Sequence, residues 1–522
     1  FTGSITGNRI ITWPVLTENF YIIKNGTSGA YTVQLKAATG SGATVTFSAT
    51  DKGYKIIYLD GVATNTGVYD VNSDLTVGDL TVTGAFEATG TIKLDGNYPT
   101  GTCNVALGDN ALGSGSLSGD FNTAVGTNAL LANTSADANT AIGRSSLCSN
   151  TTGNCNTGLG MNALLGNTEG FGNVAVGRSS MVANTTGDNN VAVGQNSLVS
   201  NTTADNNTAV GTCSLTANTT GNANTAFGIT SLQANTTGAN NVAVGRCALY
   251  SNTTASDNTA VGVSSMGLTT TGCQNTAVGQ QSLRTNSTGD NNTALGFYAL
   301  CSNTTADNNT AVGFCSLKTN STGANNTAVG RFALVFNQTG ATNTAVGQNS
   351  LHSNTTASDN TAVGAGSLYA NTTGASNVAI GRQALTASTT GAVNTAVGYG
   401  ALTTNTTGSS NTAVGYEALN KNTEALYNSA IGRQALCANT TGSSNTAVGM
   451  QALKSNTTAS DNTAIGCGAL EANTVAGNTA IGRDALTANE TGTNNVAVGL
   501  LSMVGNTTGD NNVAIGKQAL DA

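Results

Sequence analysis

The sequence contains few charged residues and few prolines, and both shortages limit the classes of protein to which the chain can belong. Only 8% of its 522 residues are charged, and proline occurs only at Pro14 and Pro99. An ordinary soluble protein carries about 25% charged residues. Disordered chains share such bias, but they combine high net charge with few aliphatic residues. Here the net charge is −8 and 39% of residues are hydrophobic, so an ordered repeat explains the composition better.

Other absences exclude whole functional classes. With 18 Lys and Arg against 26 Asp and Glu, the chain offers no basic patch for nucleic acid. It contains no run of 18 apolar residues that would span a membrane. No nucleophile elbow, phosphate-binding loop or zinc-protease motif occurs, so we expect no enzyme activity, no cofactor and no metal. The chain begins at Phe1 rather than Met, so we expect a processed protein or a fragment.

Cysteine and histidine do not form a recognisable site. The ten cysteines include no Cys-x-x-Cys pair, which argues against zinc. Their density is far below that of a disulfide-stapled scaffold, so we expect free thiols. The single histidine, His352, is predicted to be a solvent-exposed surface residue, and the aspartates of the TTGDNN segments (Asp188, Asp290 and Asp510) to be turn residues rather than cation ligands.

A 17-residue repeat dominates the sequence. The pentapeptide Asn-(Thr/Val/Ser)-Ala-(Val/Ile/Leu)-Gly, with looser copies at Asn104 and Asn156, occurs 25 times between Asn104 and Asn512, almost always 17 residues apart. Asn at position 1 and Gly at position 5 never vary, and position 9 is Leu or Met. This period is too short for a helical repeat. It predicts one short strand per coil, with turns at the glycine and at the later Asn-Thr-Thr-Gly, and therefore a parallel β-solenoid over residues 104–522.

Alternation along the strand predicts which positions share a face. We expect positions 2 and 4 to point inward with the leucine of position 9, so that Val312 is a core residue. Asn at positions 1 and 12 should form ladders between coils. Coils stacked about 4.8 Å apart would make a rod of roughly 120 Å. Glycosylation at Asn-Thr-Thr is the weaker interpretation, because glycans on every coil would collide.

Position 3 is Ala in every coil but one, which has Gly158. If this position faces outward, its small size indicates close approach of a second chain. One coil alone buries few apolar side chains. We therefore expect a homo-oligomer, most simply a homotrimer, packed through the position-3 alanines.

The first part of the chain does not repeat. Residues 1–71 contain five strand-like segments separated by glycine-rich turns, which predict a small antiparallel β-sandwich or barrel that serves as an attachment domain. Residues 72–103 carry glycine every six residues (Gly78, Gly84, Gly90 and Gly96), and are expected to form an intertwined β linker. The five strands predicted within residues 1–71 are RIITW, NFYII, YTVQL, ATVTFSA and YKIIYL.

The motif N-T-A-V-G-x-x-(A/S)-L resembles the head repeats of YadA-type trimeric adhesins, and the 17-residue form with N-T-T-G is similar to repeats in tail-fibre proteins of cyanophages. This resemblance covers 104–522, and the stretch from YTVQL to YKIIYL resembles small β-domains near the start of phage fibres. It implies a trimeric fibre of a virion tail that mediates host attachment, with other tail proteins bound through the N-terminal domain and a polysaccharide or protein receptor on the host. The alternatives are a bacterial surface adhesin and, in another class, an ice-binding solenoid.

Variable positions carry the candidate contact residues. Arg331, Arg382 and Arg433 share position 6 and recur every three coils. With Tyr369, Tyr399 and Tyr416 they are a possible glycan-contact surface, although duplication of three-coil blocks also explains the period. The ice-binding alternative needs outward rows of threonine, whereas our register places the threonines of position 2 inward.

Overall fold

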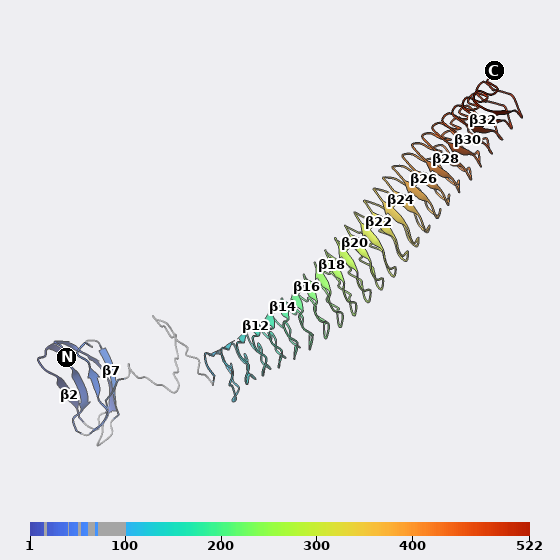
Figure 1. Ribbon diagram of the computed structural model, residues 1–522. Coiled ribbons are helices and arrows are strands. Elements are labelled where there is room, and N and C mark those ends of the chain that lie inside the picture. The colour runs from blue at the N-terminus through green and yellow to red at the C-terminus, as the bar shows by residue number, and fades with distance from the viewer. Residues whose placement is uncertain (15–17, 40, 51–53, 61–67, 71–100, 522) are drawn as a thin grey trace. The chain divides into compact units, whose positions relative to one another are not determined.

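The computed structural model describes residues 1–14, 18–39, 41–50, 54–60, 68–70 and 101–521. The chain divides into two compact units, Phe1–Lys93 and Leu94–Ala522. Residues 72–100, which make up most of the predicted linker, lie outside the described residues, so its intertwined structure stays a prediction. Figure 1 shows the described strands of both units.

The first unit consists of three small β-sheets. Its strands are β1 (Thr2–Ser4), β2 (Arg9–Trp13), β3 (Glu18–Lys24), β4 (Gly26–Ser28), β5 (Val33–Ala37), β6 (Val45–Phe47), β7 (Tyr54–Asp60) and β8 (Val68–Asp70). The sheets have the orders β1-β4, β2-β5-β6 and β3-β7-β8. Leu35, Phe47, Ile57 and Leu59 are fully buried and form the centre of the core.

Each of the five predicted strands lies in one of these sheets, but the pairing is not wholly antiparallel. Strand β2 pairs with β5 in parallel, as β1 does with β4. The remaining pairs are antiparallel. A parallel pair needs a crossover rather than a hairpin, and here β3 and β4 lie between β2 and β5 along the chain.

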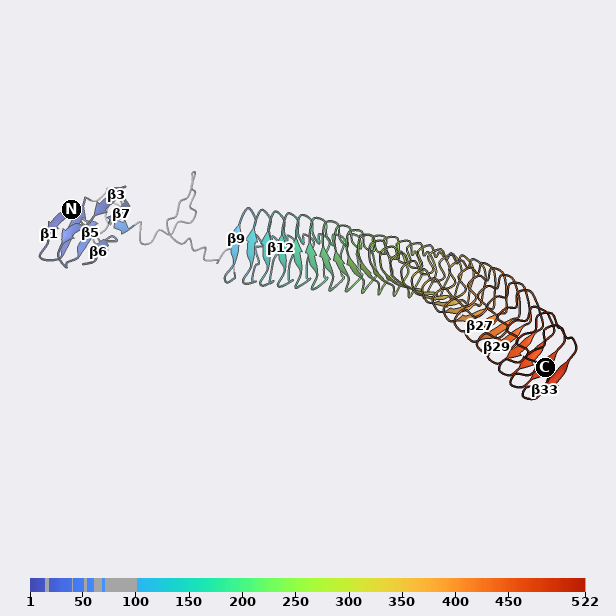
Figure 2. The same ribbon diagram turned by 90° about the horizontal axis from the view of Figure 1, so that it is seen from above.

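The second unit is a parallel β-solenoid with one three-residue strand in each coil. Its strands are β9 (Val105–Leu107), β10 (Thr123–Val125), β11 (Thr140–Ile142), β12 (Thr157–Leu159), β13 (Val174–Val176), β14 (Val191–Val193), β15 (Thr208–Val210), β16 (Thr225–Phe227), β17 (Val242–Val244), β18 (Thr259–Val261), β19 (Thr276–Val278), β20 (Thr293–Leu295), β21 (Thr310–Val312), β22 (Thr327–Val329), β23 (Thr344–Val346), β24 (Thr361–Val363), β25 (Val378–Ile380), β26 (Thr395–Val397), β27 (Thr412–Val414), β28 (Ser429–Ile431), β29 (Thr446–Val448), β30 (Thr463–Ile465), β31 (Thr479–Ile481), β32 (Val496–Val498) and β33 (Val513–Ile515). Every strand pairs with the next at the same repeat position, as in Ala311 opposite Ala328. The predicted solenoid is confirmed, and Figure 2 shows that it curves along its length.

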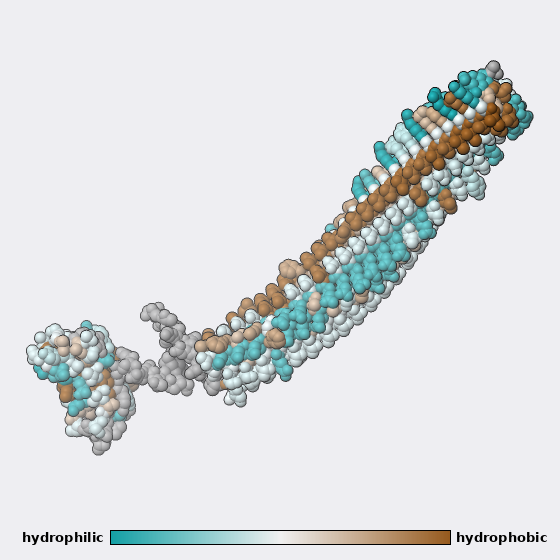
Figure 3. Space-filling view, in the orientation of Figure 1, coloured by the Kyte–Doolittle hydropathy of each residue, from teal (hydrophilic) through white to brown (hydrophobic). Residues whose placement is uncertain are grey.

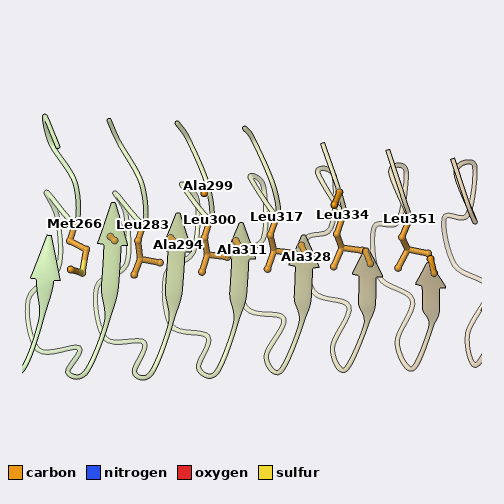
Figure 4. Packing of buried hydrophobic residues seen from close by; sticks show 14 of the residues in the cluster. Met266, Leu283, Ala294, Ala299, Leu300, Ala311, Leu317, Ala328, Leu334 and Leu351 are labelled. Atoms are coloured by element: carbon orange, nitrogen blue, oxygen red, sulfur yellow. The ribbon is translucent and has the colours of Figure 1, made fainter. Parts of the chain in front are cut away.

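The predicted direction of the strand side chains is wrong. Position 3 points inward, since Ala311 is fully buried, while Thr310 and Val312 on either side of it are partly exposed. The buried alanines pack against the leucines of position 9, as Figure 4 shows for Ala311, Leu317 and neighbouring coils. A coil of 17 residues encloses a thin interior, in which leucine from one wall leaves room only for alanine on the other. At Gly158, the one glycine at this position, a Cβ atom would lie 2.3 Å from Ser146 Oγ, but Ser265 and Ala277 occupy the same two positions elsewhere, so this contact does not explain the glycine.

Glycine at position 5 is required by both conformation and space. Gly330, for example, has φ +134°, and a Cβ atom there would lie 2.6 Å from the carbonyl oxygen of Gly347 in the next coil. The leucines of position 9 also lie in the left-handed region, with Leu317 at φ +49°. Such a conformation is unfavourable for leucine. We infer that burial of the leucine side chain offsets this cost.

The asparagine ladders are confirmed. At position 1, the backbone N–H of Asn173 donates to Oδ1 of Asn156 in the preceding coil at 2.9 Å. At position 12, Nδ2 of Asn184 donates to Oδ1 of Asn167 at 2.7 Å. Both Asn156 and Asn167 also donate to the carbonyl oxygen of Gly170, at 2.8 and 2.9 Å. Each coil therefore uses its two invariant or near-invariant amides to hold its own corner and to bind its neighbour.

Candidate ligand-binding surface

An apolar ridge runs along the outer face of the solenoid sheet. We define it as the side chains of position 4, which are Val, Ile, Leu or Phe in all 25 coils and are partly or fully exposed in each. Their exposure is 55% at Phe227 and reaches 72% at Ile515, in the last coil. Figure 3 shows a brown hydrophobic stripe following the solenoid. The threonines and valines of position 2 lie beside this ridge and are also partly exposed.

A first aromatic cluster lies on the turn that follows position 5. Its rings are those of Phe297, Tyr298, Phe314, Phe332, Phe336, His352 and Tyr369. Phe297 stacks on Phe314 with ring centroids 5.5 Å apart, and the guanidinium of Arg331 lies 4.6 Å from the centre of the Phe332 ring. These residues come from repeat positions 6, 7, 10 and 11 of five successive coils, which the turns bring onto one surface.

A second cluster forms a regular ladder, which we call the Arg-Tyr ladder. It consists of Arg382, Tyr399, Tyr416 and Arg433, all at position 6 of four successive coils. The two tyrosine rings stack, with centroids 5.5 Å apart and an interplanar angle of 11°. Arg382 lies 5.9 Å from the centre of the Tyr399 ring, and Arg433 lies 5.9 Å from that of Tyr416. The ladder therefore has a cation at each end and two stacked rings between them.

The structure thus separates the six predicted contact residues into two groups. Four of them make up the Arg-Tyr ladder, whereas Arg331 and Tyr369 belong to the first cluster. Between the groups, Ala365 and Gly366 occupy positions 6 and 7.

His352 lies at the surface, as predicted, but it is only partly exposed. The ring is partly buried and stacks on Tyr369 at 4.7 Å. This burial lowers the pKa of His352 below its ordinary value. Aromatic side chains of the adjacent coils cover the ring: Phe332, at position 7 of the preceding coil, and Tyr369, at position 10 of the next coil, both pack against it.

The aspartates of the TTGDNN segments act as turn residues. Oδ1 of Asp188 accepts the backbone N–H of Phe171 in the preceding coil, and Asp290 and Asp510 do the same for Cys273 and Thr493. These contacts tie successive corners together. Among the described residues, no group of three or more His, Cys, Asp or Glu side chains is placed to hold a metal ion.

The ten cysteines, all within the described residues, are free thiols in this structure. Cys301 and Cys315 are buried, and burial raises the pKa of both thiols. A shallow hollow occurs where Gly267 replaces a larger residue at position 10, lined by Tyr250, Leu268 and Arg284. In the part of the chain that the structure describes, no helix is long and apolar enough to cross a membrane.

Comparison of the chain with protein-family models, with curated proteins and with solved structures gives no match. The apolar ridge, the Arg-Tyr ladder and the solenoid that carries them are therefore the features that indicate a function.

Proposed function

We propose that the chain is the shaft of a homotrimeric fibre, which extends from a virion tail and attaches it to a host surface. The observation that carries this proposal is the apolar ridge, because it is continuous over a stiff solenoid and has no covering element among the described residues. All 25 of these side chains are at least partly exposed, so the apolar surface extends along the whole solenoid. A monomer usually exposes patches of only a few hundred Å², and a stable interface needs about 800 Å² from each partner.

We propose that the chains contact one another through the apolar ridge, and not through the position-3 alanines as predicted from the sequence. Those alanines are buried inside each chain's own core, so they are not available to a partner. Three parallel copies, each turning its ridge toward a common axis, would bury the position-4 side chains together with those of position 2. In this arrangement the first unit would bind other tail proteins, and the outer surface of the shaft would be free to contact a polysaccharide or protein receptor. A virion tail is the proposed location.

Adding charge to the ridge tests this assembly. We expect Val312→Asp, Val329→Asp and Val346→Asp together to give monomers, because a charge buried at an interface without a partner is costly. The solenoid should stay folded, since these side chains lie outside the coil core. Ala324→Asp with Ala341→Asp is the matched control, because position 16 carries Asp in the preceding coils at Asp290 and Asp307.

Light scattering after size-exclusion chromatography would give the mass, and circular dichroism would report the fold. A monomeric wild-type protein, or a ridge variant that keeps the oligomer, would overturn the proposal. The bacterial alternative, a surface adhesin exposed on the cell, shares the trimer. The genes that flank this one distinguish the two, since tail genes favour the virion and a sequence encoding a membrane-anchoring barrel favours the adhesin.

A second function, ice binding, is favoured by one observation. Position 2 faces outward, contrary to the predicted register, and is threonine in seven successive coils from Thr259 to Thr361. A row of regularly spaced threonines beside the valines of the ridge is the kind of surface that an ice-binding solenoid needs, although the solenoid curves along its length. This function requires the ridge to face water, so it predicts a monomer with thermal hysteresis. A trimer without thermal hysteresis excludes it.

A further inference from the structure

The Arg-Tyr ladder is built like a ligand-binding surface rather than like core. Tyr399 and Tyr416 are 41% and 46% exposed, and both arginines are exposed as well. Aromatic rings that stabilise a fold usually lie in its interior, where they bury their large apolar area. Here the rings lie outside a complete core of alanine and leucine. Their faces are covered by each other and by the two arginines, whereas their edges and hydroxyl groups remain accessible.

The neighbouring polar groups suit hydroxylated ligands. On the next position of the same coils, Nε2 of Gln434 donates to Oε2 of Glu417 at 3.0 Å. The atoms of the Gln434 amide and the Glu417 carboxylate that this hydrogen bond does not use lie beside Tyr416 and can bind a ligand. Sugar-binding sites combine such amide and carboxylate groups with aromatic rings, because a pyranose has an apolar face of C–H groups and a rim of hydroxyls.

The spacing of the ladder indicates a polymer. The two arginines are separated by three coils, or about 14 Å at about 4.8 Å per coil. A linear polysaccharide lying parallel to the solenoid axis would meet one ladder residue at each coil. Its sugar rings would lie across the exposed edges and hydroxyl groups of the tyrosines, and its acidic groups would reach the arginines. The planar fork of a guanidinium binds carboxylate or sulfate through two parallel hydrogen bonds.

We propose that the Arg-Tyr ladder binds an acidic polysaccharide, with the glycan chain running along the solenoid. This inference rests on the proposed attachment function and specifies its ligand class. The carboxylate of Glu417 opposes an anion near Tyr416, so the acidic groups are assigned to the two ends of the ladder, where Arg382 and Arg433 lie. Neutral sugars would occupy the middle.

The test compares the binding of polygalacturonate fragments with that of neutral dextran, using isothermal titration calorimetry on the full chain. We expect polygalacturonate to bind more tightly, with an affinity that falls as salt is added. Arg382→Ala with Arg433→Ala, and separately Tyr399→Ala with Tyr416→Ala, should each weaken binding about tenfold or more. Arg144→Ala with Arg178→Ala is the matched control. It removes two position-6 arginines whose following coils carry Met161 and Gln195 instead of tyrosine, and we expect unchanged affinity.

Three results would overturn the inference: no binding of polygalacturonate, equal binding of dextran, or an equal loss in the control variant. A purely structural role for the ladder predicts a lower melting temperature in the tyrosine variant without any polygalacturonate binding by the wild type. The mass of each sample, measured in parallel, separates the two proposals. A trimer that does not bind polygalacturonate refutes the ligand but leaves the fibre intact, whereas a monomer that binds it refutes the fibre and leaves the ladder as a glycan site.

Discussion

Replacing Thr269 with asparagine should close a gap in the position-12 ladder. Nδ2 of Asn252 donates to Oδ1 of Asn235 at 2.7 Å, but Oδ1 of Asn252 has no hydrogen-bond partner. The next coil carries Thr269, whose buried Oγ1 is also unpaired. The ladder resumes with Asn286, whose Oδ1 accepts from Asn303 at 2.7 Å. Two buried polar atoms are therefore left without partners at one break.

The backbone at this break is ready to accept an asparagine. The N–H of Thr269 donates to the carbonyl oxygen of Met266 at 3.2 Å, as the N–H of Asn252 does to that of Leu249. An amide at position 269 would donate to Asn252 and accept from Asn286. A buried, unpaired polar group costs about 1–3 kcal/mol. Thr269→Asn should therefore reduce the local opening equilibrium by between about fivefold and about a hundredfold.

Hydrogen–deuterium exchange of peptides covering residues 250–290 is the assay, because a long repeat array opens locally and does not unfold in one step. Exchange should slow in these peptides and stay unchanged in distant coils. The reverse substitution, Asn303→Thr, should create a second break and speed exchange around it. Unchanged or faster exchange in Thr269→Asn would refute the idea that the amide ladder stabilises the solenoid.

Three further predictions concern single positions. Gly330→Ala should destabilise its coil by more than about 1–2 kcal/mol, since it adds left-handed strain to a clash with the next coil. Gly115→Ala is the control and should be tolerated, because nothing lies within 4 Å of a Cβ atom there and its φ is not in the left-handed region; equal melting of the two variants would contradict the steric argument. Leu334→Ala should cost about 2–5 kcal/mol by leaving a cavity, and faster local exchange would show it. Since burial lowers the pKa of His352, its neutral form is favoured in the fold. The buried neutral ring contributes fully to the stability of the fold above the unfolded pKa of about 6.5. This contribution decreases as the pH falls through that value toward the folded pKa. An NMR titration of this single histidine that gives a pKa of 6.5 or higher would contradict the burial of its ring.

The period of the sequence was sufficient to predict the architecture. Invariant Asn and Gly at a 17-residue spacing predict stacked coils, amide ladders and a turn, because each of these needs one particular residue at one particular place. The ladder between Asn167 and Asn184 and the positive φ of Gly330 are the direct structural counterparts. Leucine at position 9 was likewise placed in the core, as Leu317 shows.

The inward face of the strand could not be predicted in the same way. Alternation shows that Thr310 and Val312 share a face, but it does not show which face is buried. Ordinary hydrophobic preference puts valine inside and leaves alanine ambiguous. The deciding factor is the width of the coil, which depends on where Leu317 enters from the opposite wall. That geometry includes a leucine at a left-handed φ, which a sequence pattern does not reveal.

The two aromatic clusters also differ in how far the sequence alone could predict them. Tyr399 and Tyr416 are 17 residues apart at one repeat position, so their stacking could have been predicted from the period alone. The first cluster combines positions 6, 7, 10 and 11, and contacts such as that between Phe332 and His352 depend on the path of the turn. A residue's position in the repeat predicts its neighbour in the next coil, but not its neighbours within a coil.

The contrast between positions 4 and 6 gives the strongest reason to expect a partner on the ridge. Both positions face outward, and neither fills the coil interior. Position 6 accepts threonine, glutamine, arginine, tyrosine and cysteine, whereas position 4 is apolar in every one of the 25 coils. Strand propensity alone would also allow threonine, which position 2 uses freely. A restriction to apolar residues on an outward surface, absent from the other outward row, is what the proposed contact between copies of the chain along the ridge predicts.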